Sequence, residues 1–361
     1  MPSTESLSHE ELILCSCGDR EYTTRDVIDA ALWRGELGPA WEHFLMGLEA
    51  EKRADEEELD LEDNELDSAA ETFRYERDLI TAEETEQWLA ARSLTLDDFS
   101  DFFSRKCWGD RLEEEVNVPE TPYISVSDDL RQLFAAELIL TGDIEELTTN
   151  LMWRLAARVE TEPDGDATAD EQKRFFEKHQ IDRAELPDWL SRLGRDAAWF
   201  NDMAAMEAAY RQRSTSVLLP AALKSELSSL RLALTRYETE VIEVESRDAA
   251  QEAMFCVTED GMSMEEVATE GRYPCRRVEF LLEDLPAELQ QIFMSVSPGD
   301  LLDPMPHGDG FELCRVVNKT EPDPTDASVK QRIEERLLDR HFSDLASKHV
   351  ERRLGAVIST E

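Results

Sequence analysis

The sequence predicts a mainly helical protein that contains one small α+β domain, and three observations support this fold class. Apolar residues recur at helical spacing over most of residues 1–234, with capping residues at several expected helix starts. Strand-like patterns concentrate in residues 235–320, where they alternate with short helical segments. A long amphipathic helix follows a proline-broken connector near the end of the chain.

Residues 1–234 are expected to form an essentially all-helical module, which opens with a short strand at Leu12–Cys17. Thr81 is followed three residues later by Glu84, the spacing of a capping box, and Thr95 is expected to cap the next helix. That helix carries aromatic residues on a single face, which we interpret as core: Phe99, Phe102, Phe103 and Trp108.

An acidic segment lies inside this module. Residues 49–67 contain eleven carboxylates and only two basic side chains. A calcium loop requires a fixed carboxylate spacing and a glycine at the sharp turn, and neither is present. The composition favours a solvated helix surface or loop, with a surface for basic peptides as the alternative.

Residues 235–320 are expected to fold as a β-α-α-β-α-β domain with strands at Glu238–Glu245, Arg277–Leu282 and Phe311–Val317. Residues 321–361 are expected to form a connector and one long helix, Ser328–Leu354. That helix carries seven Lys and Arg against five acids, although the chain as a whole is strongly acidic. We therefore expect it to pack back onto the acidic helical module, to which residues 321–361 would belong.

The net charge of −44, from 82 acidic and 38 basic residues, disfavours non-specific binding to nucleic acid and binding to anionic membranes. No apolar run approaches the ~18 residues of a membrane span, and the N-terminal residues lack the basic region of a secretory signal. We expect a cytoplasmic protein with neutral or basic partners. Dispersed cysteines and histidines and the lack of nucleotide-binding motifs predict no metal and no cofactor.

The segment Tyr237–Lys319 resembles a parvulin-type peptidyl-prolyl isomerase domain. The resemblance is carried by DAAQEAM and EDGMSMEEVA after the first strand, by the turn Ser297–Asp300 (SPGD), and by the closing strand Gly310–Leu313 (GFEL). Helices before this domain and one after it resemble the SurA-like and PrsA-like foldases, whose helical module cradles unfolded chains. Residues 81–108 are also similar to isomerase-like proteins found beside peptide natural-product clusters.

The resemblance implies catalytic positions at Glu240, Asp309 and Glu312, where active parvulins carry histidines in the first and last strands and often Ser or Thr before the last. Two ionised carboxylates in place of two facing histidines repel each other, so the resemblance implies a degenerate site. The apolar residues that match the proline-ring pocket, with domain core as the alternative interpretation, are Phe280, Leu285, Leu289 and Met294.

The function implied is that of a cytoplasmic SurA-like chaperone or maturation factor with a degenerate parvulin domain. It would hold an unfolded or precursor peptide or protein, with a modifying enzyme or an exporter as a further partner. One alternative is an active peptidyl-prolyl isomerase with a non-standard site. Another is a structural subunit of an enzyme complex.

Overall fold

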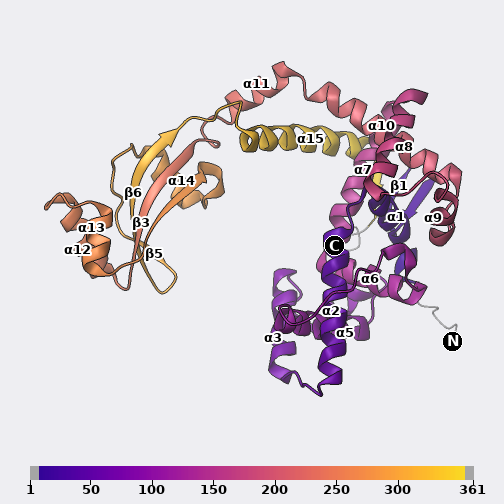
Figure 1. Ribbon diagram of the computed structural model, residues 1–361, viewed down its shortest axis with the longest axis horizontal. Coiled ribbons are helices and arrows are strands. Elements are labelled where there is room, and N and C mark those ends of the chain that lie inside the picture. The colour runs from indigo at the N-terminus through magenta and orange to yellow at the C-terminus, as the bar shows by residue number, and fades with distance from the viewer. Residues whose placement is uncertain (1–7, 354–361) are drawn as a thin grey trace. The chain divides into compact units, whose positions relative to one another are not determined.

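The computed structural model describes residues 8–353, which form two compact units joined by the chain at two places (Figure 1). The helical unit contains residues up to Ser216 and again from Arg340 onward, and the α+β unit contains Val217–Asp339. The predicted fold class, mainly helical with one small α+β domain, is confirmed.

The helical unit is built mostly from ten helices of the described chain, with two short 3-10 turns, His9–Glu11 and Tyr123–Ser125. The helices are α1 Thr24–Arg34, α2 Gly38–Glu56, α3 Asp63–Glu76, α4 Ala82–Ala90, α5 Leu96–Leu112, α6 Asp128–Thr141, α7 Asp143–Glu160, α8 Gly165–His179, α9 Leu186–Leu193 and α10 Ala197–Val217. A three-stranded antiparallel sheet accompanies them, in the order β2 Arg20–Thr23, β1 Ile13–Cys17 and β7 Val350–Arg352.

Local signals in the sequence explain where several helices begin. The hydroxyls of Thr81 and Thr95 accept hydrogen bonds from the backbone N–H groups of Glu84 and Asp98, and these two side chains complete capping boxes. The aromatic face of α5 is core as predicted, because Phe99, Phe102, Phe103 and Trp108 are all buried.

Most of the acidic side chains described in residues 49–67 are exposed on α2, on α3 or in the loop between these helices, whereas Glu51 is half-buried and accepts a hydrogen bond from the Ser104 hydroxyl of α5. Beneath them Ala50 and Ala54 of α2 are buried against Trp108 and Leu112 of α5. This exposure agrees with a solvated helix surface and loop, and the alternative, a surface for basic peptides, stays a prediction.

The α+β unit contains a four-stranded antiparallel sheet in the order β4-β3-β6-β5. Its elements are α11 Pro220–Ser229, β3 Arg236–Val244, α12 Arg247–Thr258, α13 Met264–Gly271, β4 Cys275–Leu281, the 3-10 turn Leu282–Asp284, α14 Ala287–Ser295, β5 Met305–His307 and β6 Gly310–Thr320. Strand β5, which forms a hairpin with β6, was not expected from the sequence.

Each face of this sheet supports its own apolar core (Figure 1). On one face Ile242 and Leu313 pack with residues of α12 and α13. On the other face Val241 and Cys314 pack with Phe293 of α14. We call these the α12–α13 face and the α14 face.

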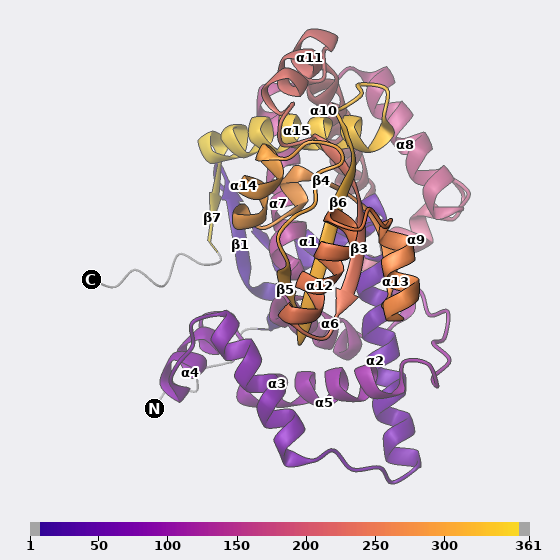
Figure 2. The same cartoon turned by 90° about the vertical axis from the view of Figure 1, so that its left-hand side faces the viewer.

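The C-terminal helix α15, Ala327–His349, belongs to both units. Its first half buries Val329, Ile333 and Leu337 against Leu234 and Leu281 of the α+β unit. Only its second half belongs to the helical unit, although the whole helix was expected to do so, and β7 pairs with β1 beyond it (Figure 2). The helix ends at His349, before the predicted end; Leu354 lies outside the described residues.

The observed division of the chain therefore differs from the expected boundaries. The units divide at 216/217 and 339/340, rather than at 234/235 and 320/321. The reason is the apolar cluster around Leu234, to which Leu223 and Leu227 of α11 and Val329 of α15 contribute. These residues belong to the α+β unit because that is where their apolar surface is buried.

Candidate functional site

Glu240 and Glu312 lie on opposite faces of the sheet, so the expectation that they face each other is wrong. In the register of β3 and β6, Glu240 lies opposite Arg315 and Glu312 lies opposite Glu243. Because side chains alternate along a strand, Glu240 shares the α12–α13 face with Ile242, whereas Glu312 shares the α14 face with Cys314. The carboxylate that the structure brings to Glu312 is that of Glu243.

Glu240 is held by two arginines. One carboxylate oxygen accepts a hydrogen bond from Arg277 at 2.9 Å and the other from Arg315 at 2.5 Å. Burial alone would raise the pKa of Glu240, but hydrogen bonds and charges from these two arginines outweigh it and lower that pKa. Glu240 is therefore a fixed anion at neutral pH.

Glu312 and Glu243 are bridged by one arginine. The guanidinium of Arg276 donates to Glu243 at 2.8 Å and to Glu312 at 2.7 Å, and the His307 ring nitrogen lies 3.6 Å from Glu312. The repulsion expected between facing acids is thus compensated by a cation. Asp309, in the turn after β5, lines a cavity of about 550 Å³ together with Glu243 and His307.

Three of the four predicted pocket residues lie together on the α14 face. Phe280, Leu285 and Leu289 are half-buried and cover the apolar cluster that includes Tyr237 and Phe293. The Phe280 ring stacks on Tyr237 at 5.8 Å, and the Tyr237 hydroxyl donates to the backbone oxygen of Phe293 at 2.7 Å. These contacts favour the core interpretation for the three residues. Met294 lies outside this cluster and is 42% exposed.

The ion pairs of Glu240 with Arg277 and Arg315 predict that the stability of the α+β unit depends on pH. Because the pKa of Glu240 is lowered from 4.5, its contribution to folding is present above that value and is lost as pH falls through the folded-state pKa. Protection of β3 and β6 amides against hydrogen exchange should thus be weaker in Glu240→Gln than in the parent at pH 7, and equal in strongly acidic buffer. A difference that grows on acidification would contradict this assignment.

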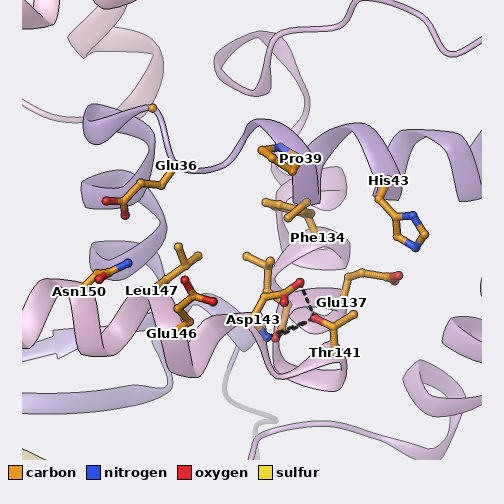
Figure 3. A pocket seen from close by; sticks show the side chains of 13 residues that line it. Glu36, Pro39, His43, Phe134, Glu137, Thr141, Asp143, Glu146, Leu147 and Asn150 are labelled. Atoms are coloured by element: carbon orange, nitrogen blue, oxygen red, sulfur yellow. Dashed lines mark hydrogen bonds between the residues drawn. The ribbon is translucent and has the colours of Figure 1, made fainter. Parts of the chain in front are cut away.

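The helical unit contains two adjoining cavities that the sequence did not indicate. The first, of about 600 Å³, lies among α2, α6 and α7 and is called here the α2–α7 cavity (Figure 3). The second, of about 550 Å³, is lined by α2, α3, α5 and α6. His43, Glu137 and Thr141 line both cavities, and we call the two adjoining cavities together the groove of the helical unit.

Glu137, which lines both cavities, belongs to a buried ion pair. Arg105 of α5 donates to Glu137 of α6 at 2.9 Å, and the two side chains are 4% and 10% exposed. Burial raises the pKa of Glu137, and the charge of Arg105 offsets only part of that shift. The groove therefore has a weakly hydrated wall at its centre.

The cysteines and the helices give no sign of metal or membrane chemistry within the described chain. Burial raises the pKa of Cys15 to about 12 and that of Cys314 to about 11, so both stay thiols at neutral pH. Among residues 8–353 no three His, Cys, Asp or Glu side chains gather as metal ligands would. None of the helices described is both long and apolar enough to cross a bilayer.

No protein-family model and no curated protein matches the chain. Comparison with solved structures does find similar folds. The structure of the peptidylprolyl isomerase PrsA from Bacillus cereus is 11% identical in sequence and matches with a TM-score of 0.37. The match covers 68% of this chain and 93% of the PrsA chain. PrsA from Bacillus anthracis is 16% identical over 56% of this chain and 94% of that chain, with a TM-score of 0.30.

A SurA-like chaperone structure from Campylobacter jejuni is 9% identical and covers 67% of this chain and 92% of that chain, with a TM-score of 0.19. With all three TM-scores below 0.5, these likenesses assign no role to any residue. The function is therefore proposed from the geometry of this chain.

Proposed function

We propose that this protein is a cytoplasmic chaperone or maturation factor that holds an unfolded or precursor peptide or protein in the groove of its helical unit. The observation that carries this proposal is the pair of adjoining cavities, of about 600 and 550 Å³, that meet at His43, Glu137 and Thr141. Two adjoining cavities can receive successive side chains of one extended chain. The held client would then pass to a modifying enzyme or an exporter.

In this proposal the α+β unit does not catalyse prolyl isomerisation. The barrier of a peptide bond to rotation is about 18–20 kcal/mol, and lowering it requires polar groups arranged around the prolyl amide. Support comes from Glu240 and Glu312, which point to opposite faces of the sheet and are both paired with arginines. Phe280 further supports it, since its ring packs on Tyr237 and Phe293 of the domain's own core.

Two assays on the full chain test the proposal. Cis/trans exchange in a proline-containing peptide should run at the uncatalysed rate with or without the protein. Aggregation of a chemically unfolded test protein should be delayed at near-stoichiometric amounts. An exchange rate well above background that is lost in Glu312→Ala would establish the alternative, an active isomerase with a non-standard site.

A cavity-filling variant tests whether the groove holds the client. Ala40 lines the α2–α7 cavity, so Ala40→Trp should fill it and weaken the protection against aggregation. Ala169→Trp is the matched control, because Ala169 is exposed on α8 and lines neither cavity. Equal protection by both variants would place the binding surface elsewhere.

A further inference from the structure

We infer that the α2–α7 cavity receives a cationic side chain, lysine or arginine, of the held peptide. This inference rests on the proposed function and specifies the chemistry of its client. Four carboxylates line the cavity, those of Glu36, Glu137, Asp143 and Glu146. Its lining contains no lysine or arginine, and the one titratable nitrogen base is His43.

Two of the four carboxylates are already neutralised by the protein's own arginines. Glu36 lies 2.7 Å from the Arg34 guanidinium and 3.6 Å from that of Arg154. Glu137 is paired with Arg105 at 2.9 Å. The three arginines lie behind the lining, where they compensate the charges of Glu36 and Glu137.

The other two carboxylates are open to a ligand. Asp143 accepts a hydrogen bond from the Thr141 hydroxyl at 2.9 Å (Figure 3). Within residues 8–353, neither Asp143 nor Glu146 forms an ion pair with a lysine or an arginine. The cavity thus has about two uncompensated negative charges, which a lysine or arginine side chain would neutralise.

The floor of the cavity is apolar, which suits the long stem of a basic side chain. Pro39 and Ala40 of α2 line it and are exposed and half-buried, and the buried Phe134 and Leu138 of α6 lie beneath. Lysine and arginine place their methylene stems on such surfaces while the charged head reaches polar groups.

A purely structural role for these two acids must be separated from ligand binding. Both lie in the first turn of α7, where negative charge stabilises a helix through its dipole. Such a role requires no cavity, and acids in the first turns of other helices would serve it equally well. Asp97 in α5 and Asp129 in α6 are exposed examples that do not line either cavity.

The experiment compares two fluorescently labelled extended peptides that differ at one central position, arginine in one and its uncharged analogue citrulline in the other. Binding to the full chain is followed by fluorescence anisotropy. The arginine peptide should bind about tenfold more tightly, the scale of a charge-assisted hydrogen bond. This preference should decrease as salt is raised.

The variants separate the structural role from the binding role. The double variant Asp143→Asn with Glu146→Gln should reduce the arginine preference to within about twofold. The control variant Asp97→Asn with Asp129→Asn has the same change in net charge and should keep the full preference. Thermal unfolding of both variants verifies that each is folded.

The outcomes distinguish this inference from the proposed function. Equal affinity for both peptides, or a preference lost in the control variant as well, overturns the cationic subsite while the chaperone proposal stands. If neither peptide binds but aggregation of an unfolded protein is still delayed, the inference is again wrong. If protection against aggregation is also missing, both proposals fall.

Discussion

Replacing Phe342 with alanine is expected to destabilise the helical unit by about 3–5 kcal/mol, the usual cost of removing a buried aromatic ring. Phe342 is 0% exposed, and its ring lies 5.9 Å from that of Trp153 and 4.5 Å from that of Tyr210. Trp153 belongs to α7 and Tyr210 to α10, so this one ring joins the end of the described chain to two earlier helices.

Tryptophan fluorescence during urea unfolding measures this effect selectively, since all seven tryptophans lie between residues 33 and 199, within the helical unit. The control is Tyr75→Ala in α3, since Tyr75 is 63% exposed and the loss of its ring should change stability by about 0.5 kcal/mol or less. If both variants unfold at the same urea concentration as the parent, residues 340–353 do not stabilise the helical unit. A fragment that ends at Asp339 should be less stable still, because it also lacks β7.

Arg105→Met is expected to destabilise the helical unit by a similar amount, about 3–5 kcal/mol, because it leaves the Glu137 carboxylate buried without its arginine partner. The double variant Arg105→Met with Glu137→Leu should recover most of this loss, since both buried charges are then absent. Urea unfolding of the two single variants and the double variant completes a thermodynamic cycle that isolates the coupling between the pair.

The stability of Arg105→Met should also depend on pH, and the sign is opposite to that predicted for Glu240, because the pKa of Glu137 is raised and that of Glu240 is lowered. Burial raises the pKa of Glu137, and losing Arg105 removes the charge that lowers it. A carboxyl whose folded-state pKa is raised favours folding below its unfolded pKa and loses that contribution as pH rises through the folded value. The destabilisation of Arg105→Met should therefore shrink as pH falls from 7 towards 4.5. A destabilisation that grows on acidification would contradict the assignment.

Structural features that depend on residues close together in the chain were predictable from the sequence. The capping boxes at Thr81 and Thr95 depend on side chains three residues apart, and the aromatic face of α5 depends on helical spacing within one element. The separation of a helical module from a small α+β domain was also predictable, because it follows from a change of hydrophobic period along the chain.

Features that depend on pairing between distant segments were not predictable. Strand β7 has three residues and follows directly on a long helix, so it gives no pattern of its own until β1 is beside it. The boundary near residue 216 likewise depends on Leu234 being buried against Val329, far along the chain. Such contacts are set by packing rather than by local preference.

The error in the candidate site has a specific cause in β3. The alternation of apolar and acidic residues in this strand breaks at Val241 and Ile242, which are adjacent and both buried, at 5% and 0% exposure. A strand buried on both faces has no single apolar side, so the face of Glu240 cannot be read from its neighbours. The groove was missed because His43, Glu137 and Thr141 come from separate helices and form no motif.

The pairing of β7 with β1 also affects how the protein is made. During synthesis β1 emerges among the first described residues, and its second neighbour emerges after the entire α+β unit. Until then one edge of β1 has unpaired backbone groups, and the apolar surface of α7 and α10 that covers Phe342 is open to water. Nascent chains in this condition are prone to misassociation. A protein proposed to shelter unfinished chains would thus remain one itself until Phe342 and β7 have left the ribosome.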